Sequence, residues 1–179
     1  MSERIEFRLS GSGGQGLITA GIILAKAAID DGKYAIQSQS YGPEARGGAS
    51  KAEVVISDSV IDHPKATTPK FVLCLTNEAY KKYGSTADES AVVLVDSSLD
   101  TGGRKNVLTA PILETALEEF SPIVANAIAL GFVAGCTNVV SKEKLEDALI
   151  RSVPKGTGDQ NARALARGYE FAATASLPA

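Results

Sequence analysis

Alternating apolar and polar residues define the first predicted element. Ile5, Phe7 and Leu9 are each followed by a polar residue, which is typical of a strand with one buried face. After a cluster of glycines, residues 17–29 are rich in Ala, Ile and Leu and long enough for a helix of about four turns. Gly32 follows where helices commonly end in a left-handed residue. The chain is therefore predicted to begin with a strand, a glycine-rich turn and a helix.

Strand-like and helix-like segments then alternate along the chain. The periodicity predicts further strands over residues 34–39, 51–56, 71–75, 91–95 and 107–108. It predicts helices over residues 77–83 (with Asn77 as the cap), 113–120 and 123–136, and after Ser141 and Gly156. This order predicts a single α/β domain over residues 1–179, in three layers. Its mostly parallel, Rossmann-like sheet should have helices on both faces and be followed by a helical C-terminal third.

The helix predicted over residues 123–136 is apolar nearly all round, which indicates that it is buried. On this helix Ala127, Gly131 and Gly135 recur at every fourth residue. Such a stripe of small residues lets another backbone approach closely, so we expect a second element to pack tightly against it.

Composition and charge exclude several function classes. The 179 residues carry 18 basic and 21 acidic side chains, which gives no general attraction for nucleic acid or an anionic membrane. No apolar signal region opens the chain, and its longest apolar run is shorter than the roughly 20 residues that span a bilayer. Cys74, Cys136 and His63 cannot alone supply a tetrahedral zinc site or hold an iron–sulfur cluster. We expect a soluble cytoplasmic protein without a metal site, since two isolated thiols suit a reducing compartment.

The first candidate site is the glycine-rich turn between the first strand and the first helix. It is made of Gly11, Ser12, Gly13, Gly14, Gln15 and Gly16. Glycines permit a tight turn, and the helix that follows offers unpaired N–H groups to an anion or a partner. A dinucleotide site needs an acidic residue about 20 positions on, but the second predicted strand ends in Gln37-Ser38-Gln39-Ser40. Two alternatives remain open: a ligand or partner contact, or a turn that needs glycine for its shape alone.

The second candidate site is the loop over residues 40–48, here called the second loop. Its candidate residues are Ser40, Tyr41, Gly42, Pro43, Glu44, Arg46, Gly47 and Gly48. Because the loop follows the second strand, we expect it at the same sheet edge as the glycine-rich turn. Glu44 and Arg46 could bind a ligand there, or they could pair with each other in a rigid loop.

Together the two motifs resemble the gamma subunit of 2-oxoacid:ferredoxin oxidoreductases. The similarity continues through Ser57-Asp58, Ile61-Asp62-His63-Pro64, residues 125–131, Asn161 and Gly168-Tyr169-Glu170. It therefore covers nearly the whole chain in the same order. The 2-oxoglutarate branch of the family is the most similar, and the pyruvate and branched-chain oxoacid branches are close relatives.

The resemblance implies a subunit of an enzyme that decarboxylates a 2-oxoacid with coenzyme A, yields an acyl-CoA and passes electrons to ferredoxin. It implies alpha and beta partner subunits and, in some such enzymes, a ferredoxin-like delta subunit. Thiamine diphosphate, magnesium and iron–sulfur clusters are expected on those partners, and none of them on this chain alone. An isolated chain could pair with a second copy through the surface that normally meets the partners.

The same resemblance implies that this chain has no catalytic residue, because the thiamine cofactor itself carries the chemistry. Both candidate sites are expected to face the thiamine-binding subunits and to help accept coenzyme A. Arg46 is the strongest candidate, since a guanidinium binds phosphate or carboxylate through two hydrogen bonds. The alternatives are a freestanding nucleotide- or anion-binding module, and a scaffold protein without a ligand.

Overall fold

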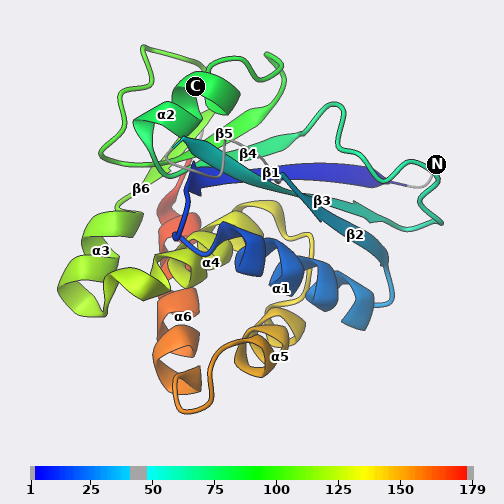
Figure 1. Cartoon of the computed structure of the whole chain (residues 1–179), viewed down its shortest axis with the longest axis vertical. Coiled ribbons are helices and arrows are strands. Elements are labelled where there is room, and N and C mark those ends of the chain that lie inside the picture. Colours follow the sequence, from blue (N-terminus) through cyan, green and yellow to red (C-terminus); the bar gives the residue numbers. More distant parts are fainter. Residues whose placement is uncertain (1–2, 41–47, 177–179) are drawn as a thin grey trace.

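Six strands form one sheet in the computed structural model, which describes residues 3–40 and 48–176 (Figure 1). They are β1 (Arg4–Ser12), β2 (Tyr34–Gln39), β3 (Ala49–Ser57), β4 (Phe71–Cys74), β5 (Val92–Asp96) and β6 (Val107–Ala110). Their order across the sheet is β2-β3-β1-β4-β5-β6. The strands predicted from hydrophobic periodicity are all present, and the predicted α/β class is confirmed.

Five of the six strands run in the same direction, and β3 is the exception. β1, β4, β5 and β6 pair in parallel, whereas β3 pairs antiparallel with β1 on one side and with β2 on the other. The cause lies in the connection from β2 to β3 over residues 40–48, because a parallel crossover needs a dozen residues or more. A short connection returns the chain antiparallel and places β3 between β1 and β2.

Helices cover the two faces of the sheet unequally. One face carries four helices: α1 (Leu17–Asp30), α4 (Ala125–Thr137), α5 (Lys142–Ser152) and α6 (Gly158–Thr174) (Figure 1). The other face carries α2 (Asn77–Ala79), which continues as the π-helical turn η2 (Tyr80–Gly84). Between β6 and α4 come α3 (Ile112–Glu119) and the 3-10 turn η3 (Pro122–Val124). The predicted helices on both faces and the helical C-terminal third are therefore confirmed.

Two separate cores follow from this arrangement. The larger core joins Phe7, Leu9 and Ile56 of the sheet to the four helices. The smaller core lies on the opposite face, where Val72, Val93 and Val95 pack beneath Tyr80 and Tyr83 of η2 together with Ala49, Cys74 and Ala79. Because apolar side chains of β4 and β5 alternate between these cores, both strands appear as continuous apolar runs in the sequence.

Helices α4 and α6 approach each other closely through glycine. A Cβ atom built on Gly131 would lie 2.1 Å from the carbonyl oxygen of Leu165, and one on Gly168 would lie 2.1 Å from the carbonyl oxygen of Ile128. On Gly135 the Cβ would lie 2.5 Å from Ala172. The small-residue stripe therefore does accept another backbone, as its spacing predicted, and the partner is α6.

Two local predictions were wrong. The cap of α2 is Thr76, whose hydroxyl accepts a hydrogen bond from the N–H of Ala79. Asn77 cannot be the cap, because it is already the first residue of the helix. Ile123 is 78% exposed, since Pro122 sets a 3-10 turn before α4 begins.

Candidate functional site

The carboxyl ends of β1 and β4 mark the point where the chain changes sides of the sheet. After β1 the chain enters α1 on one face, and after β4 it enters α2 on the other (Figure 1). β1 and β4 are neighbours in the sheet, so the loops that follow them diverge to opposite faces. Open α/β sheets bind ligands at such a switch point.

The glycine-rich turn lies at this edge, and its own side chains help to hold its shape. Gly11 and Ser12 end β1, and the N–H of Ser12 donates to Oε1 of Gln15 at 2.8 Å. A Cβ on Gly11 would lie 2.3 Å from that same Oε1 atom, so only glycine leaves room for Gln15 to fold back. Gly14 adopts a positive φ of 86°, which an L side chain would strain. The shape of the turn therefore requires glycine at positions 11 and 14.

Gly16 connects the turn to helix α4. It has a φ of 75°, and its carbonyl accepts a hydrogen bond from Nδ2 of Asn126 at 3.2 Å. A Cβ on Gly16 would lie 2.6 Å from that Nδ2 atom. The other amide atom, Oδ1 of Asn126, is buried and accepts no hydrogen bond. The contact joins residues 110 positions apart and fixes the start of α1 against the start of α4.

The second loop begins and ends at the same edge as the glycine-rich turn. Ser12 pairs with Ala49, and the N–H of Ser40 donates to the carbonyl of Lys51 at 3.4 Å. The flanks therefore confirm that the two motifs share one edge, because β2 and β1 run in the same direction. Within the loop, Tyr41, Gly42, Pro43, Glu44, Arg46 and Gly47 lie outside the described residues, so their roles stay predictions.

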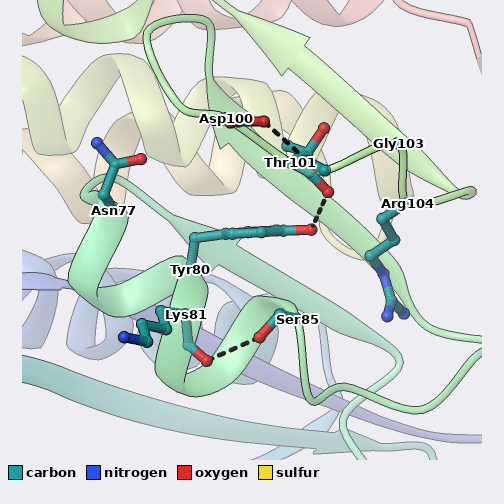
Figure 2. A pocket seen from close by; sticks show the side chains of 9 residues that line it. Asn77, Tyr80, Lys81, Ser85, Asp100, Thr101, Gly103 and Arg104 are labelled. Carbon is teal, nitrogen blue, oxygen red and sulfur yellow. Dashed lines mark hydrogen bonds between the residues drawn. The ribbon is translucent and has the colours of Figure 1, made fainter.

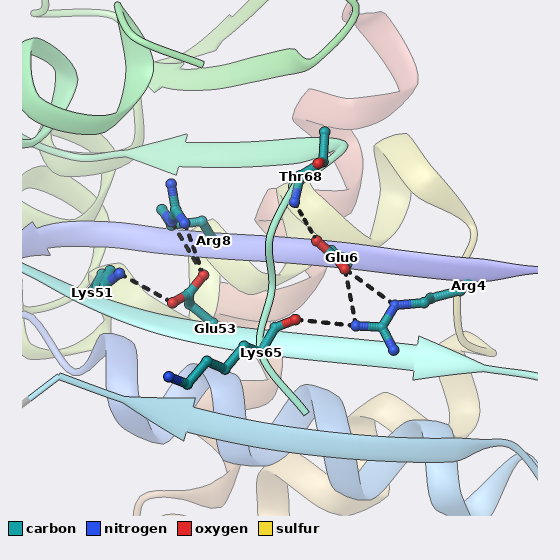
Figure 3. A network of polar contacts seen from close by, with 7 residues as sticks. All are labelled: Arg4, Glu6, Arg8, Lys51, Glu53, Lys65 and Thr68. Atoms are coloured by element: carbon teal, nitrogen blue, oxygen red, sulfur yellow. Dashed lines mark hydrogen bonds and ion pairs between the residues drawn. The ribbon is translucent and has the colours of Figure 1, made fainter. Parts of the chain in front are cut away.

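Charged side chains occupy the sheet face that lacks long helices (Figure 3). Glu53 of β3 pairs with Arg8 of β1 at 3.0 Å and with Lys51 at 3.1 Å. Arg8 and Lys51 also lie 5.5 and 5.7 Å from the ring centre of Tyr83, within the range of cation–π attraction. Toward the start of β1, Glu6 accepts from Arg4 and from the N–H of Thr68. Sequence reasoning missed both clusters, since strand alternation shows which side chains share a face but not which strands are neighbours.

Two of the cavities in the described part of the chain open near the carboxyl ends of β1 and β5. The larger, about 670 Å³, lies between η2 and the loop after β5 (Figure 2). Tyr80 crosses it and donates its hydroxyl proton to the carbonyl of Thr101 at 2.7 Å, and Lys81, Asp100 and Arg104 supply charge at its walls. The smaller, about 270 Å³, lies between the starts of α1, α4 and α6 and is lined by Gly16 and Asn126. Gly14 and Gly16 of the glycine-rich turn line the smaller cavity, whereas no candidate site residue from the sequence analysis lines the larger one.

His63, Cys74 and Cys136 lie in separate parts of the fold and do not form a common site. His63 lines a separate cavity near the start of β1, Cys74 is buried in β4, and Cys136 is half-buried in α4. In residues 3–40 and 48–176, no group of three or more His, Cys, Asp or Glu side chains is placed to hold a metal ion. No helix in these ranges combines the length and apolar character needed to cross a bilayer.

Cys74 should be chemically inert in the folded chain. Burial raises the pKa of its thiol to about 11, although the nearby Ser10 hydroxyl acts in the opposite direction. At pH 8 the thiolate is then about 100-fold scarcer than in an unperturbed cysteine, and the thiolate is the reactive form. Iodoacetamide should therefore label Cys74 slowly in the native chain and rapidly in the urea-unfolded chain, as peptide mass mapping can follow. Rapid native labelling would contradict the buried position.

Comparison with known proteins identifies the family. Residues 6–171 match the family described as pyruvate ferredoxin/flavodoxin oxidoreductase. The 2-oxoglutarate synthase subunit KorC of Methanocaldococcus jannaschii is 51% identical over 94% of each chain. The pyruvate synthase subunit PorC of Methanothermobacter thermautotrophicus is 35% identical over 93% of this chain and 94% of the relative.

Solved structures agree with these sequence relatives. A keto/oxoacid ferredoxin oxidoreductase gamma subunit from Geobacter sulfurreducens superposes with a TM-score of 0.87 at 45% identity, over 97% of this chain and 99% of that one. A 2-oxoglutarate:ferredoxin oxidoreductase from Magnetococcus marinus has the same TM-score at 20% identity, where this chain matches 32% of a longer chain and the fold alone is shared. The resemblance to gamma subunits is thereby confirmed, and the chain belongs to the pyruvate ferredoxin/flavodoxin oxidoreductase family.

Proposed function

We propose that this chain is the gamma subunit of an enzyme that oxidatively decarboxylates 2-oxoglutarate with coenzyme A, yielding succinyl-CoA and CO2 and passing electrons to ferredoxin. The observation that carries the proposal is the 51% identity, over 94% of each chain, to a subunit named for 2-oxoglutarate synthesis. The pyruvate relative has 35% identity over a similar share of the chain, which favours 2-oxoglutarate over pyruvate.

The cofactors of this reaction do not fit the described residues of this chain. An iron–sulfur cluster needs several cysteine ligands, whereas Cys74 and Cys136 lie in different elements, β4 and α4. Thiamine diphosphate needs a magnesium site for its diphosphate, and no metal-binding cluster is formed in the described ranges. We therefore assign both groups to the alpha and beta subunits and to a ferredoxin-like delta subunit. Thiamine diphosphate, when bound, supplies the chemistry at its own thiazolium carbon.

The contribution of this chain is then a binding face at the carboxyl edge of its sheet. The glycine-rich turn and the flanks of the second loop lie together there, and a bare glycine backbone allows close approach by a ligand or a partner. Oε1 of Gln15 accepts from the N–H of Ser12, and its amide nitrogen is the group that could donate to a ligand. In this proposal Arg46 binds a phosphate or carboxylate group through two parallel hydrogen bonds. Gly47 and Gly48 would let that group come close to the backbone, because glycine has no side chain.

Purification from the native cell tests the assignment. We expect the tagged chain, isolated gently without oxygen, to bring down partner chains that contain thiamine diphosphate and iron. The complex should reduce ferredoxin fastest with 2-oxoglutarate when pyruvate and branched-chain 2-oxoacids are compared at equal concentration. A chain that is purified alone and without cofactors would favour the independent binding module. A faster rate with pyruvate would change the assigned substrate from 2-oxoglutarate to pyruvate.

Arg46→Ala tests the binding face within the assembled complex. Loss of a two-pronged contact to an anion should raise the KM for coenzyme A about tenfold or more, or loosen the complex, because charged hydrogen bonds are the strong ones. Arg163→Ala is the matched control, since Arg163 is exposed on α6. Steady-state kinetics and size-exclusion chromatography provide the readout. Unchanged kinetics and unchanged assembly in Arg46→Ala would remove this residue from the face.

A further inference from the structure

We draw no further inference here: the strongest candidate, the cavity between η2 and the loop after β5, has Tyr80, Asp100 and Arg104 in its walls already hydrogen-bonded to backbone groups of the chain itself, and nothing in the described residues shows what would occupy it.

Discussion

Gly168→Ala is expected to lower the free energy of unfolding by about 3 kcal/mol, at the upper end of the usual cost of overpacking. The new methyl carbon would lie 2.1 Å from the carbonyl oxygen of Ile128 and 2.6 Å from the N–H nitrogen of Phe132. Both are backbone atoms of α4, so no side chain can rotate away and the two helices must separate. For a chain of this size such a loss lowers Tm by about 6–12 °C.

Gly158→Ala is the matched control for this prediction. It introduces the same methyl group into the same helix, where the nearest neighbour is a side-chain carbon of Ile150 at 3.6 Å, an ordinary contact. Because alanine is the better helix former, the control should be neutral or slightly stabilising. Urea unfolding followed by circular dichroism measures both. Equal stability of the two variants would mean that α4 and α6 are not held as closely as described.

Glu53→Leu should be the second large effect, about 2 kcal/mol of lost stability. Arg8 and Lys51 share the Glu53 carboxylate, and their side chains are 20% and 24% exposed, so its loss leaves two poorly hydrated cations facing each other (Figure 3). Breaking a fully buried pair costs about 3–5 kcal/mol, and the residual exposure of these cations reduces the figure. The measurement is urea unfolding of the full chain at low and high salt.

Two further variants identify the cause. Glu119→Leu breaks the Arg167 pair, whose carboxylate is 43% exposed, and should cost far less because water and salt screen it. Arg8→Met combined with Glu53→Leu should recover part of the loss, since an apolar pair replaces Arg8 and Glu53 and only Lys51 is left without its carboxylate. If Glu119→Leu and Glu53→Leu cost the same, burial of the Glu53 cluster is not the source of its effect.

Local features of the chain could be predicted from residue patterns because their causes are local. Gly32 adopts a φ of 82° after α1, and Ser141 accepts from the N–H of Lys144 at the start of α5, both as the sequence indicated. The spacing of Gly131 and Gly135 predicted a close helix contact, because the positions of glycines can be read directly from the sequence. The identity of the partner helix was not visible, since nothing local ties α4 to Gly168.

The sequence by itself determined the order of strands and helices, the glycine-rich turn and the family resemblance, all of which depend on neighbouring residues. Only the tertiary structure decided that β3 lies antiparallel between β1 and β2, and this placement brings Arg8 to Glu53. It also decided that Asn126 meets Gly16 across 110 residues beside the smaller cavity. Such contacts arise when helices and strands pack as whole bodies to bury apolar surface, so no local pattern records them.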